Sequence, residues 1–321
     1  MKIMNRTLLL LIIFITTSFT SLYAGPGASA ANFLKIGCGS RAVALGETYV
    51  SLADDPSALY WNPAGLALLA RPSILFSYNK WLEGITHGFV GVNLKKYNWG
   101  VLGVGIAYLS LADMDAYDEF DRSIGKASAH DIAAMFGYAK DFMINELKIR
   151  YGIEYKYINQ KLDDTTANAH GIDIGLLTKV LDDKVQVGFS IQNLLSTKMK
   201  FYVAEAMMER VFRLGVSYLG DISKRKYVIS AEVDFHEDDV RFGLGSEIEV
   251  YDPLVFRLGY RKRDLGNGVS AGLGFEIKDI KIDYAFNNYG EFSDTHMLTI
   301  SMLLDNFSKL GKKENQNYAW K

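Results

Sequence analysis

The sequence predicts an all-β protein, a transmembrane antiparallel β-barrel of about 14 strands with an N-terminal plug in its lumen. Apolar and polar residues alternate with a period of two along most of the chain after residue 70, and this alternation is typical of strands. The alternating segments are close to the ~9–11 residues that cross a bilayer obliquely. Their connections are short at one rim and include two long ones at the other, which is the pattern of outer-membrane barrels.

The composition permits a large apolar surface and excludes several other classes of protein. Of the 321 residues, 49% are apolar and 22% are charged, with 29 Gly and 5 Pro, so the chain is neither disordered nor collagen-like. The formal net charge of −2 gives no electrostatic reason to expect a nucleic-acid partner. The length would suit about two globular domains, but large β-barrels form one domain at this length.

The first residues have the composition of a secretory signal peptide. Lys2 and Arg6 precede the apolar run 8–15, and small and polar residues follow up to Ala24. The run is shorter than the ~20 apolar residues of a membrane-spanning helix. We therefore expect residues 1–24 to be a cleaved signal and the mature chain to leave the cytoplasm for the outer membrane.

Residues 25–70 are expected to fill the lumen, because a barrel of about 14 strands is too wide for its own side chains to fill. Asp55 is suited to cap a short helix that continues through Tyr60 and has a proline at its first position. A second proline disfavours helix at Asn62, so the chain should turn there. Gly65 permits a left-handed exit from that turn.

The strand-like segments that follow define the predicted barrel, residues 71–305. In order they are 73–80, 86–96, 99–110, 131–140, 147–160, 171–180, 185–194, 211–219, 227–236, 240–250, 254–263, 269–278, 280–288 and 296–304. The links 111–129 and 195–210 are long and lie on the same rim. Tyrosines near strand ends are expected on the lipid face as an aromatic girdle, namely Tyr108, Tyr138, Tyr157, Tyr218 and Tyr227. Residues 306–321 form a predicted C-terminal tail.

Charged side chains on the polar face of the strands should point into the lumen. They are Arg150, Glu154, Lys156, Glu232, Asp234, Arg241, Glu247, Arg257, Arg261, Glu276 and Asp283. Both signs occur on neighbouring strands, which favours pairing across strands and docking of the plug. The alternative is a surface that selects a charged head group.

The stretch GCGSRAVALGETYVSLADDPSALYWNPAGLA, residues 37–67, resembles the N-terminal signature of the PorV/PorQ family. That family belongs to the FadL-like long-chain fatty acid transporter class of outer-membrane β-barrels. The resemblance implies a fourteen-stranded barrel in which the Asn-Pro-Ala segment is part of a hatch. Cys38 and Glu47 stand where small residues are usual. The hatch or plug motif comprises Gly37, Gly39, Arg41, Gly46, Asp54, Asp55, Asn62, Pro63, Ala64 and Gly65.

The resemblance implies a non-enzymatic function, the passage of hydrophobic or amphipathic small molecules across the outer membrane. The alternative is a barrel of the type IX secretion system that receives secreted proteins and hands them on. A possible ligand groove comprises Phe201, Tyr202, Met207 and Met208 in the second long link. The expected partners are outer-membrane lipid and either a hydrophobic ligand or secreted protein substrates.

Several short patterns favour structural roles over chemical ones, so we expect no catalytic residue, metal or cofactor. Ser270 stands in a Gly-x-Ser-x-Gly pattern, but the pattern lies inside a predicted strand and not at a strand-to-helix turn. The cysteine at position 38 lies too far from the apolar run for a lipid anchor. The histidines His87, His130, His170, His236 and His296 lack metal-ligand spacing. The acidic residues Asp113, Asp115, Asp118, Glu119 and Asp121 fit a solvated loop better than a Ca²⁺ site.

Overall fold

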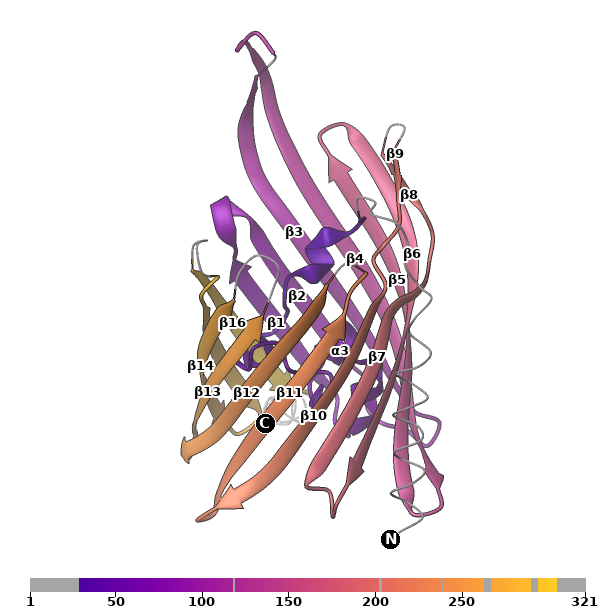
Figure 1. Cartoon of the computed structure of the whole chain (residues 1–321), viewed down its shortest axis with the longest axis vertical. Helices are drawn as coiled ribbons and strands as arrows, with labels where there is room; N and C mark the ends of the chain where they lie inside the picture. Colours follow the sequence, from indigo (N-terminus) through magenta and orange to yellow (C-terminus); the bar gives the residue numbers. More distant parts are fainter. Residues whose placement is uncertain are drawn as a thin grey trace, which may run out of the picture.

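The protein is a closed antiparallel β-barrel in a computed structural model that describes residues 29–304, apart from 118, 202–203, 238, 263–266 and 290–293 (Figure 1). Within these residues, fourteen strands pair in sequence order, and the first pairs with the last to close the barrel. The predicted fold class is therefore confirmed. The predicted signal peptide and the tail 306–321 lie outside the described residues.

Short helices precede the barrel, and strands make up nearly all of the rest. The helices are η1 (Asn32–Lys35), α2 (Ser40–Ala44), α3 (Ala58–Trp61) and η2 (Pro63–Leu68), with η3 (Leu82–Gly84) between the first two strands. The barrel strands are β1 (Ser73–Lys80), β2 (Thr86–Asn93), β3 (Val101–Tyr117), β4 (Ser123–Ile144), β5 (Leu147–Leu162), β6 (Thr165–Val180), β7 (Val185–Ser196), β10 (Val211–Ile222), β11 (Arg225–Phe235), β12 (Val240–Tyr251), β13 (Leu254–Lys262), β14 (Gly268–Ile277), β15 (Ile280–Asn287) and β16 (Thr295–Leu303). A small hairpin, β8 (Met199–Phe201) and β9 (Ala204–Ala206), lies between β7 and β10. No helix in the described part of the chain is long and apolar enough to cross a membrane.

The two faces of the strands have the polarity of a barrel embedded in lipid. Outward side chains such as Ile153 and Leu244 are apolar and are 47% and 45% exposed. Inward side chains such as Ser77, Ser217 and Ser230 are polar and buried. A soluble sandwich would bury the apolar face instead, so this arrangement requires an apolar solvent around the barrel.

The two rims differ, although only one of the two predicted long links, 197–210, is present. At one rim the links are short, namely 94–100, 145–146, 181–184, 223–224, 252–253 and 278–279. In outer-membrane barrels such a rim faces the periplasm, and the rim with longer loops faces outward. We call these the short-turn rim and the long-loop rim.

One predicted loop is wrong. Residues 111–129 were expected to form a long link, but β3 and β4 continue through them and pair as a hairpin, with Met114 opposite Ala127. The hairpin projects well beyond the neighbouring strands (Figure 1). The backbone N–H and C=O groups of its two strands bond to each other. The strands therefore extend without the alternation of apolar and polar residues that marks the segments facing lipid. Asp115, Glu119 and Asp121 are exposed on it, and no group of three or more potential metal ligands occurs among the described residues.

Outward tyrosines also cover glycines of the adjoining strand. The ring of Tyr108 lies over Gly88, and the ring of Tyr227 lies over Gly220. Tyr157 and Tyr218 are exposed on the outer face, as the girdle prediction requires. An aromatic ring over a strand glycine fills the space that a side chain at that position would occupy.

Replacing Leu244 by Arg should lower the free energy of unfolding by ~2–4 kcal/mol, because a guanidinium would enter hydrocarbon near the bilayer midplane. Leu244→Met is the matched control and should change stability little, since it keeps an apolar side chain of similar volume. The measurement is urea unfolding of the barrel in lipid vesicles, followed by heat-modifiable migration. Equal stability of the two variants would contradict the assignment of this face to lipid.

Candidate functional site in the barrel lumen

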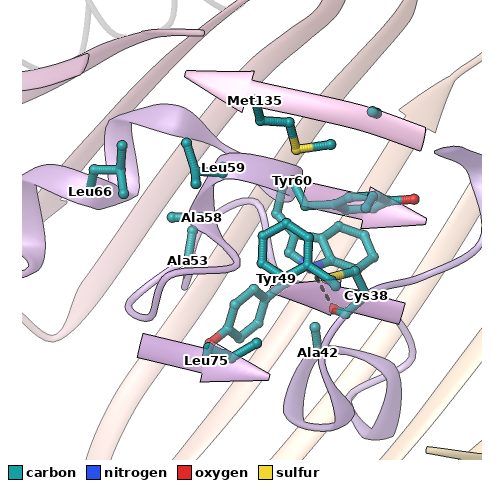
Figure 2. Close-up of a cluster of buried hydrophobic side chains, with 14 of the residues drawn as sticks. Cys38, Ala42, Tyr49, Ala53, Ala58, Leu59, Tyr60, Leu66, Leu75 and Met135 are labelled. Atoms are coloured by element: carbon teal, nitrogen blue, oxygen red, sulfur yellow. Dashed lines mark hydrogen bonds between the residues drawn. The ribbon is translucent and has the colours of Figure 1, made fainter. Parts of the chain in front are cut away.

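The N-terminal segment, residues 29–70, lies across the lumen of the barrel (Figure 1). Its helix α2 contacts β13 to β16, and η2 contacts the opposite wall at β3 to β6. The middle of the segment forms a buried apolar cluster with inward side chains of the strands (Figure 2). Trp61 and Tyr49 in this cluster are almost completely buried, and their rings meet edge to face at 6.3 Å. The segment therefore fills the lumen that the barrel cannot fill alone.

The turn at Asp55 differs from the helix cap that the sequence predicts there. The carboxylate of Asp55 accepts hydrogen bonds from the backbone N–H of Ser57 at 2.8 Å and from its hydroxyl at 2.5 Å. This is an Asx-turn, and α3 begins after it, with Ser57 and not Asp55 as the N-cap residue. The helix ends at Trp61, close to the predicted end.

Asn62 makes the second turn, as predicted. Its backbone is extended, and its side chain accepts from the N–H of Ala64 while Pro63 opens η2. The same amide donates to the carbonyls of Val50 at 2.7 Å and of Leu176 in β6 at 3.1 Å. Asn62 therefore connects two parts of the segment to the barrel wall.

The predicted left-handed exit at Gly65 is wrong, because this residue lies inside η2 and has no positive φ. Glycine is required there for another reason. A Cβ atom at this position would lie 2.0 Å from the carbonyl oxygen of Ala53. The residue thus permits close contact between two turns of the segment.

Inward glycines of the strands let the backbone of the segment approach the barrel wall. A Cβ atom at Gly152 would lie 2.2 Å from the carbonyl carbon of Pro63, and one at Gly188 would lie 2.2 Å from the carbonyl oxygen of Val50. The same holds on the other side, where a Cβ at Gly259 would lie 2.1 Å from the amide nitrogen of Gly46. The glycines on the polar face of the strands are therefore the seat of the segment.

Arg41 fastens the segment to the barrel on the short-turn side. Its guanidinium donates two hydrogen bonds to Glu247 of β12, at 2.8 and 3.0 Å, and one to Asp54 at 2.5 Å. Glu247 also accepts from Arg257 at 2.6 Å, and Arg257 donates to Asp283 at 2.7 Å. The bidentate pair and its extension compensate for the removal of these charges from water.

A second network holds the segment at the neighbouring strands β10 and β11. The N–H of Val50 donates to Glu232 at 2.8 Å, and Arg213 lies 3.1 Å from Asp234. The guanidinium of Arg213 also stacks on the ring of Trp61, 5.0 Å from its centroid. Arg261 pairs with the same aspartate. These contacts support the interpretation of the inward charges as partners for each other and for the segment.

The structure brings together most residues of the predicted motif. The carboxylates of Asp54 and Asp55 both lie within hydrogen-bond distance of the Tyr49 hydroxyl, at 2.9 and 2.8 Å, and this hydroxyl accepts from the Arg41 guanidinium. Burial raises the pKa of Asp55, and the charge of Asp54 adds to this effect. Gly39 and Gly46 have φ of 82° and 65°, and Ala64 and Pro63 are buried in η2. At Gly37 a Cβ would lie 2.8 Å from a carboxylate oxygen of Glu47.

Sequence reasoning missed Tyr49 and Trp61 as central residues of the site. Their signal was weak, because single aromatic residues in a short irregular segment show no periodicity. The indole N–H of Trp61 donates to the carbonyl of Cys38 at 2.9 Å. Cys38 itself is fully buried, and burial raises the pKa of its thiol well above the ordinary value, so it is a packing residue and not a reactive group.

The predicted groove residues do not share one orientation. Met207 is 48% exposed, whereas Met208 is 3% exposed and lies against Gly171. The carbonyl of Met207 accepts from the N–H of Ala30, so this link also holds the start of the N-terminal segment. Phe201 is partly buried, and Tyr202 lies outside the described residues.

The cavities on the two sides of the segment differ greatly in size. On the short-turn side a chamber of about 830 Å³ is lined by charged residues such as Arg41, Asp54 and Arg257 and by apolar residues such as Leu68, Val228 and Leu303. On the long-loop side a cavity of about 40 Å³ lies below η1 and the link that contains Met208. Ser270, the serine of the Gly-x-Ser-x-Gly pattern, lies within β14, where its hydroxyl donates to the carbonyl of Ala44.

Replacing Asn62 by Leu should loosen the segment but leave the barrel assembled. The change leaves buried carbonyls and one N–H without partners, at about 1–3 kcal/mol each, while every strand keeps its ladder. We expect proteolysis of the segment in folded barrels to become at least about tenfold faster. The exposed residue Asn98, changed to Leu, is the control. Loss of heat-modifiable migration would show instead that the segment is needed for assembly of the barrel.

Solved structures with the same fold include two hydrocarbon transporters. The Ralstonia pickettii toluene transporter TbuX is 12% identical, with a TM-score of 0.58 over 83% of this chain and 98% of that chain. The Pseudomonas putida toluene transporter TodX is 12% identical, with a TM-score of 0.51 over 88% of this chain and 98% of that chain. At this identity the likeness shows the FadL-like fold and not the cargo. Among curated proteins, none matches this chain.

The family comparison gives a different name from the one that the N-terminal motif suggests. The model described as "Type IX secretion system membrane protein PorP/SprF" matches residues 120–302. This range covers most of the barrel strands and none of the motif at 37–67. PorV/PorQ is therefore not the family that the match shows, and what is confirmed of that expectation is the FadL-like barrel fold. The protein is an outer-membrane β-barrel and belongs to the PorP/SprF family of type IX secretion system membrane proteins.

Proposed function

We propose that this barrel works in type IX secretion with its lumen closed, as an outer-membrane component that receives secreted proteins and hands them on. The observation that carries this proposal is the seating of the N-terminal segment. Asn62, Arg41 and Val50 each bond to a different strand of the wall, and the backbone of the segment packs closely against inward strand glycines. A plug held in this way suits a scaffold better than a channel that opens for each solute.

The chamber on the short-turn side supports a role for protein segments at the periplasmic face. Its volume of about 830 Å³ accommodates several residues of an extended peptide, and both charged groups of either sign and apolar side chains line it. Such a mixed lining can pair with charged side chains of a polypeptide and contact its apolar side chains. The proposal includes the division of the chain that the sequence predicts. Residues 1–24 are an export signal, residues 25–70 are the plug, residues 71–305 are the barrel and residues 306–321 are a C-terminal tail.

Passage of hydrophobic small molecules is the second candidate. The fold shared with the toluene transporters favours it. Against it, the cavity on the long-loop side holds only about 40 Å³, and the groove residues Met207 and Met208 point to different surroundings. A hydrophobic ligand would therefore need the hatch motif, residues 37–65, to move away from its seat.

Cells that lack this chain should retain specific secreted proteins in the periplasm and lose them from the surface and the medium. The measurement is quantitative mass spectrometry of the three fractions, with a complemented strain as control. Uptake of hydrophobic compounds should be unchanged. Normal secretion together with impaired uptake would favour the second candidate and overturn the first.

The purified wild-type barrel should admit no small solutes into liposomes, since the segment closes the lumen. The Asn62→Leu variant should permit swelling in sugar solutions, because its segment is less firmly seated. Asn98→Leu should behave as the wild type does. Rapid swelling with the wild-type protein would show that the lumen conducts and would contradict a closed scaffold.

A further inference from the structure

Three outward histidines on the barrel wall share one arrangement. In each, a hydroxyl of the neighbouring strand lies next to the imidazole Nδ1: Tyr284 to His296 at 2.7 Å, Tyr155 to His170 at 2.6 Å, and Ser110 to His130 at 3.1 Å. All three imidazoles are exposed. Aromatic contacts also orient the first, because Tyr284 stacks on His296 and Phe286 flanks it at 5.7 Å.

This arrangement engages Nδ1 of each ring and leaves Nε2 as the nitrogen that can contact a ligand. A hydroxyl that donates to Nδ1 leaves the imidazole proton on Nε2. The N–H at Nε2 then points away from the hydroxyl that orients the ring. In that tautomer, or when the ring is protonated, each histidine presents an N–H donor at Nε2 on the outer surface of the barrel.

Two of these histidines each stand beside an outward lysine on the adjacent strand. Lys80 of β1 is the direct cross-strand partner of His296, and Lys161 of β5 is the direct partner of His130. Both lysines are exposed, and in the described part of the chain neither forms an ion pair. Each pair therefore combines an ammonium group and an imidazole donor on one surface.

The two pairs belong to one continuous cross-strand row. Thr86 and Ser110 connect them, since the register runs from Lys80 to Thr86, then to Ser110 and to His130. Three strand intervals separate the pairs, or roughly 14 Å along the wall at the usual strand spacing. The row has hydroxyl, ammonium and imidazole groups and no carboxylate.

The row lies toward the long-loop rim, where the apolar band of the barrel ends. Tyr78 and Leu298, one outward position nearer the short-turn rim, are 50% and 45% exposed. Carboxylates do occur nearby, at Asp294 and in the turn at Asp163. The carboxylate of Asp294 accepts from Asn288 at 2.8 Å. A cationic row at this level faces the head groups of the outer leaflet.

We propose that the Lys80–His296 and Lys161–His130 pairs bind phosphate groups of an outer-leaflet glycolipid, the lipopolysaccharide that surrounds an outer-membrane barrel. A phosphate oxygen accepts from the lysine ammonium and from the imidazole Nε2–H of the same pair. The acyl chains of the lipid then lie along the apolar face below the row. This site is on the outer wall and is independent of the lumen and its plug.

The test uses the full-length barrel in neutral-lipid nanodiscs, with bis-phosphorylated lipid A as the probe and retention by native mass spectrometry as the readout. The Lys80→Gln/Lys161→Gln double variant should bind the probe about tenfold more weakly, since it loses both charged contacts. Lys80→Arg/Lys161→Arg should restore binding. Lys200→Gln, a loss of charge at an exposed position of the β8–β9 hairpin, should leave binding unchanged.

Two further arms need only the wild-type protein. Lipid A without its phosphates should bind at least about tenfold more weakly than the phosphorylated form if the phosphates carry recognition. Phosphatidylglycerol should also bind more weakly, because it offers one diester phosphate. Equal binding of phosphorylated and dephosphorylated lipid A, or of lipid A and phosphatidylglycerol, would overturn the assignment. Equal binding by the wild type and the double glutamine variant would do the same.

Discussion

Backbone contact between the N-terminal segment and the inward strand glycines is the constraint on which the rest of the lumen depends. Where Gly152, Gly188 and Gly259 face inward, the wall has no side chains, and the backbone at Pro63, Val50 and Gly46 occupies that space. A larger residue at any of these positions would push the segment into the centre of the lumen. The path of the segment and the space left on either side of it therefore follow from one set of close contacts.

Charge pairing then fixes the segment in one orientation. Buried charges are costly unless they are paired, so Arg41 of the segment must face Glu247 of β12. On the neighbouring strand β11, Glu232 pairs with Arg213 of the wall and accepts from the N–H of Val50, and Asn62 adds a third anchor through the carbonyl of Leu176 in β6. Apolar packing around Trp61 alone would permit several orientations, whereas three polar anchors permit one.

The two lines of similarity agree on the class of the chain. The family match covers residues 120–302, which are barrel strands, and the solved transporters share the barrel fold. A family match to the wall leaves the role of the plug to be inferred from its contacts. Those contacts favour a closed barrel in secretion, and they explain why a fold used by toluene transporters need not conduct here.

The sequence by itself determined the strands, their number and their inward and outward faces, because alternation with a period of two is a local property of each strand. It also located the turn at Asn62, since a following proline restricts the backbone locally. Other features were decided by tertiary structure. The seat at the strand glycines, the central places of Tyr49 and Trp61, and the reason for glycine at position 65 all depend on atoms distant in the chain. The projecting part of the β3–β4 hairpin was predicted as a loop. Its strands are held by backbone pairing and have neither a buried nor a lipid-facing side, so their sequence does not alternate. Periodicity records which face of a strand meets lipid, but contacts across a lumen leave no periodic trace in the sequence.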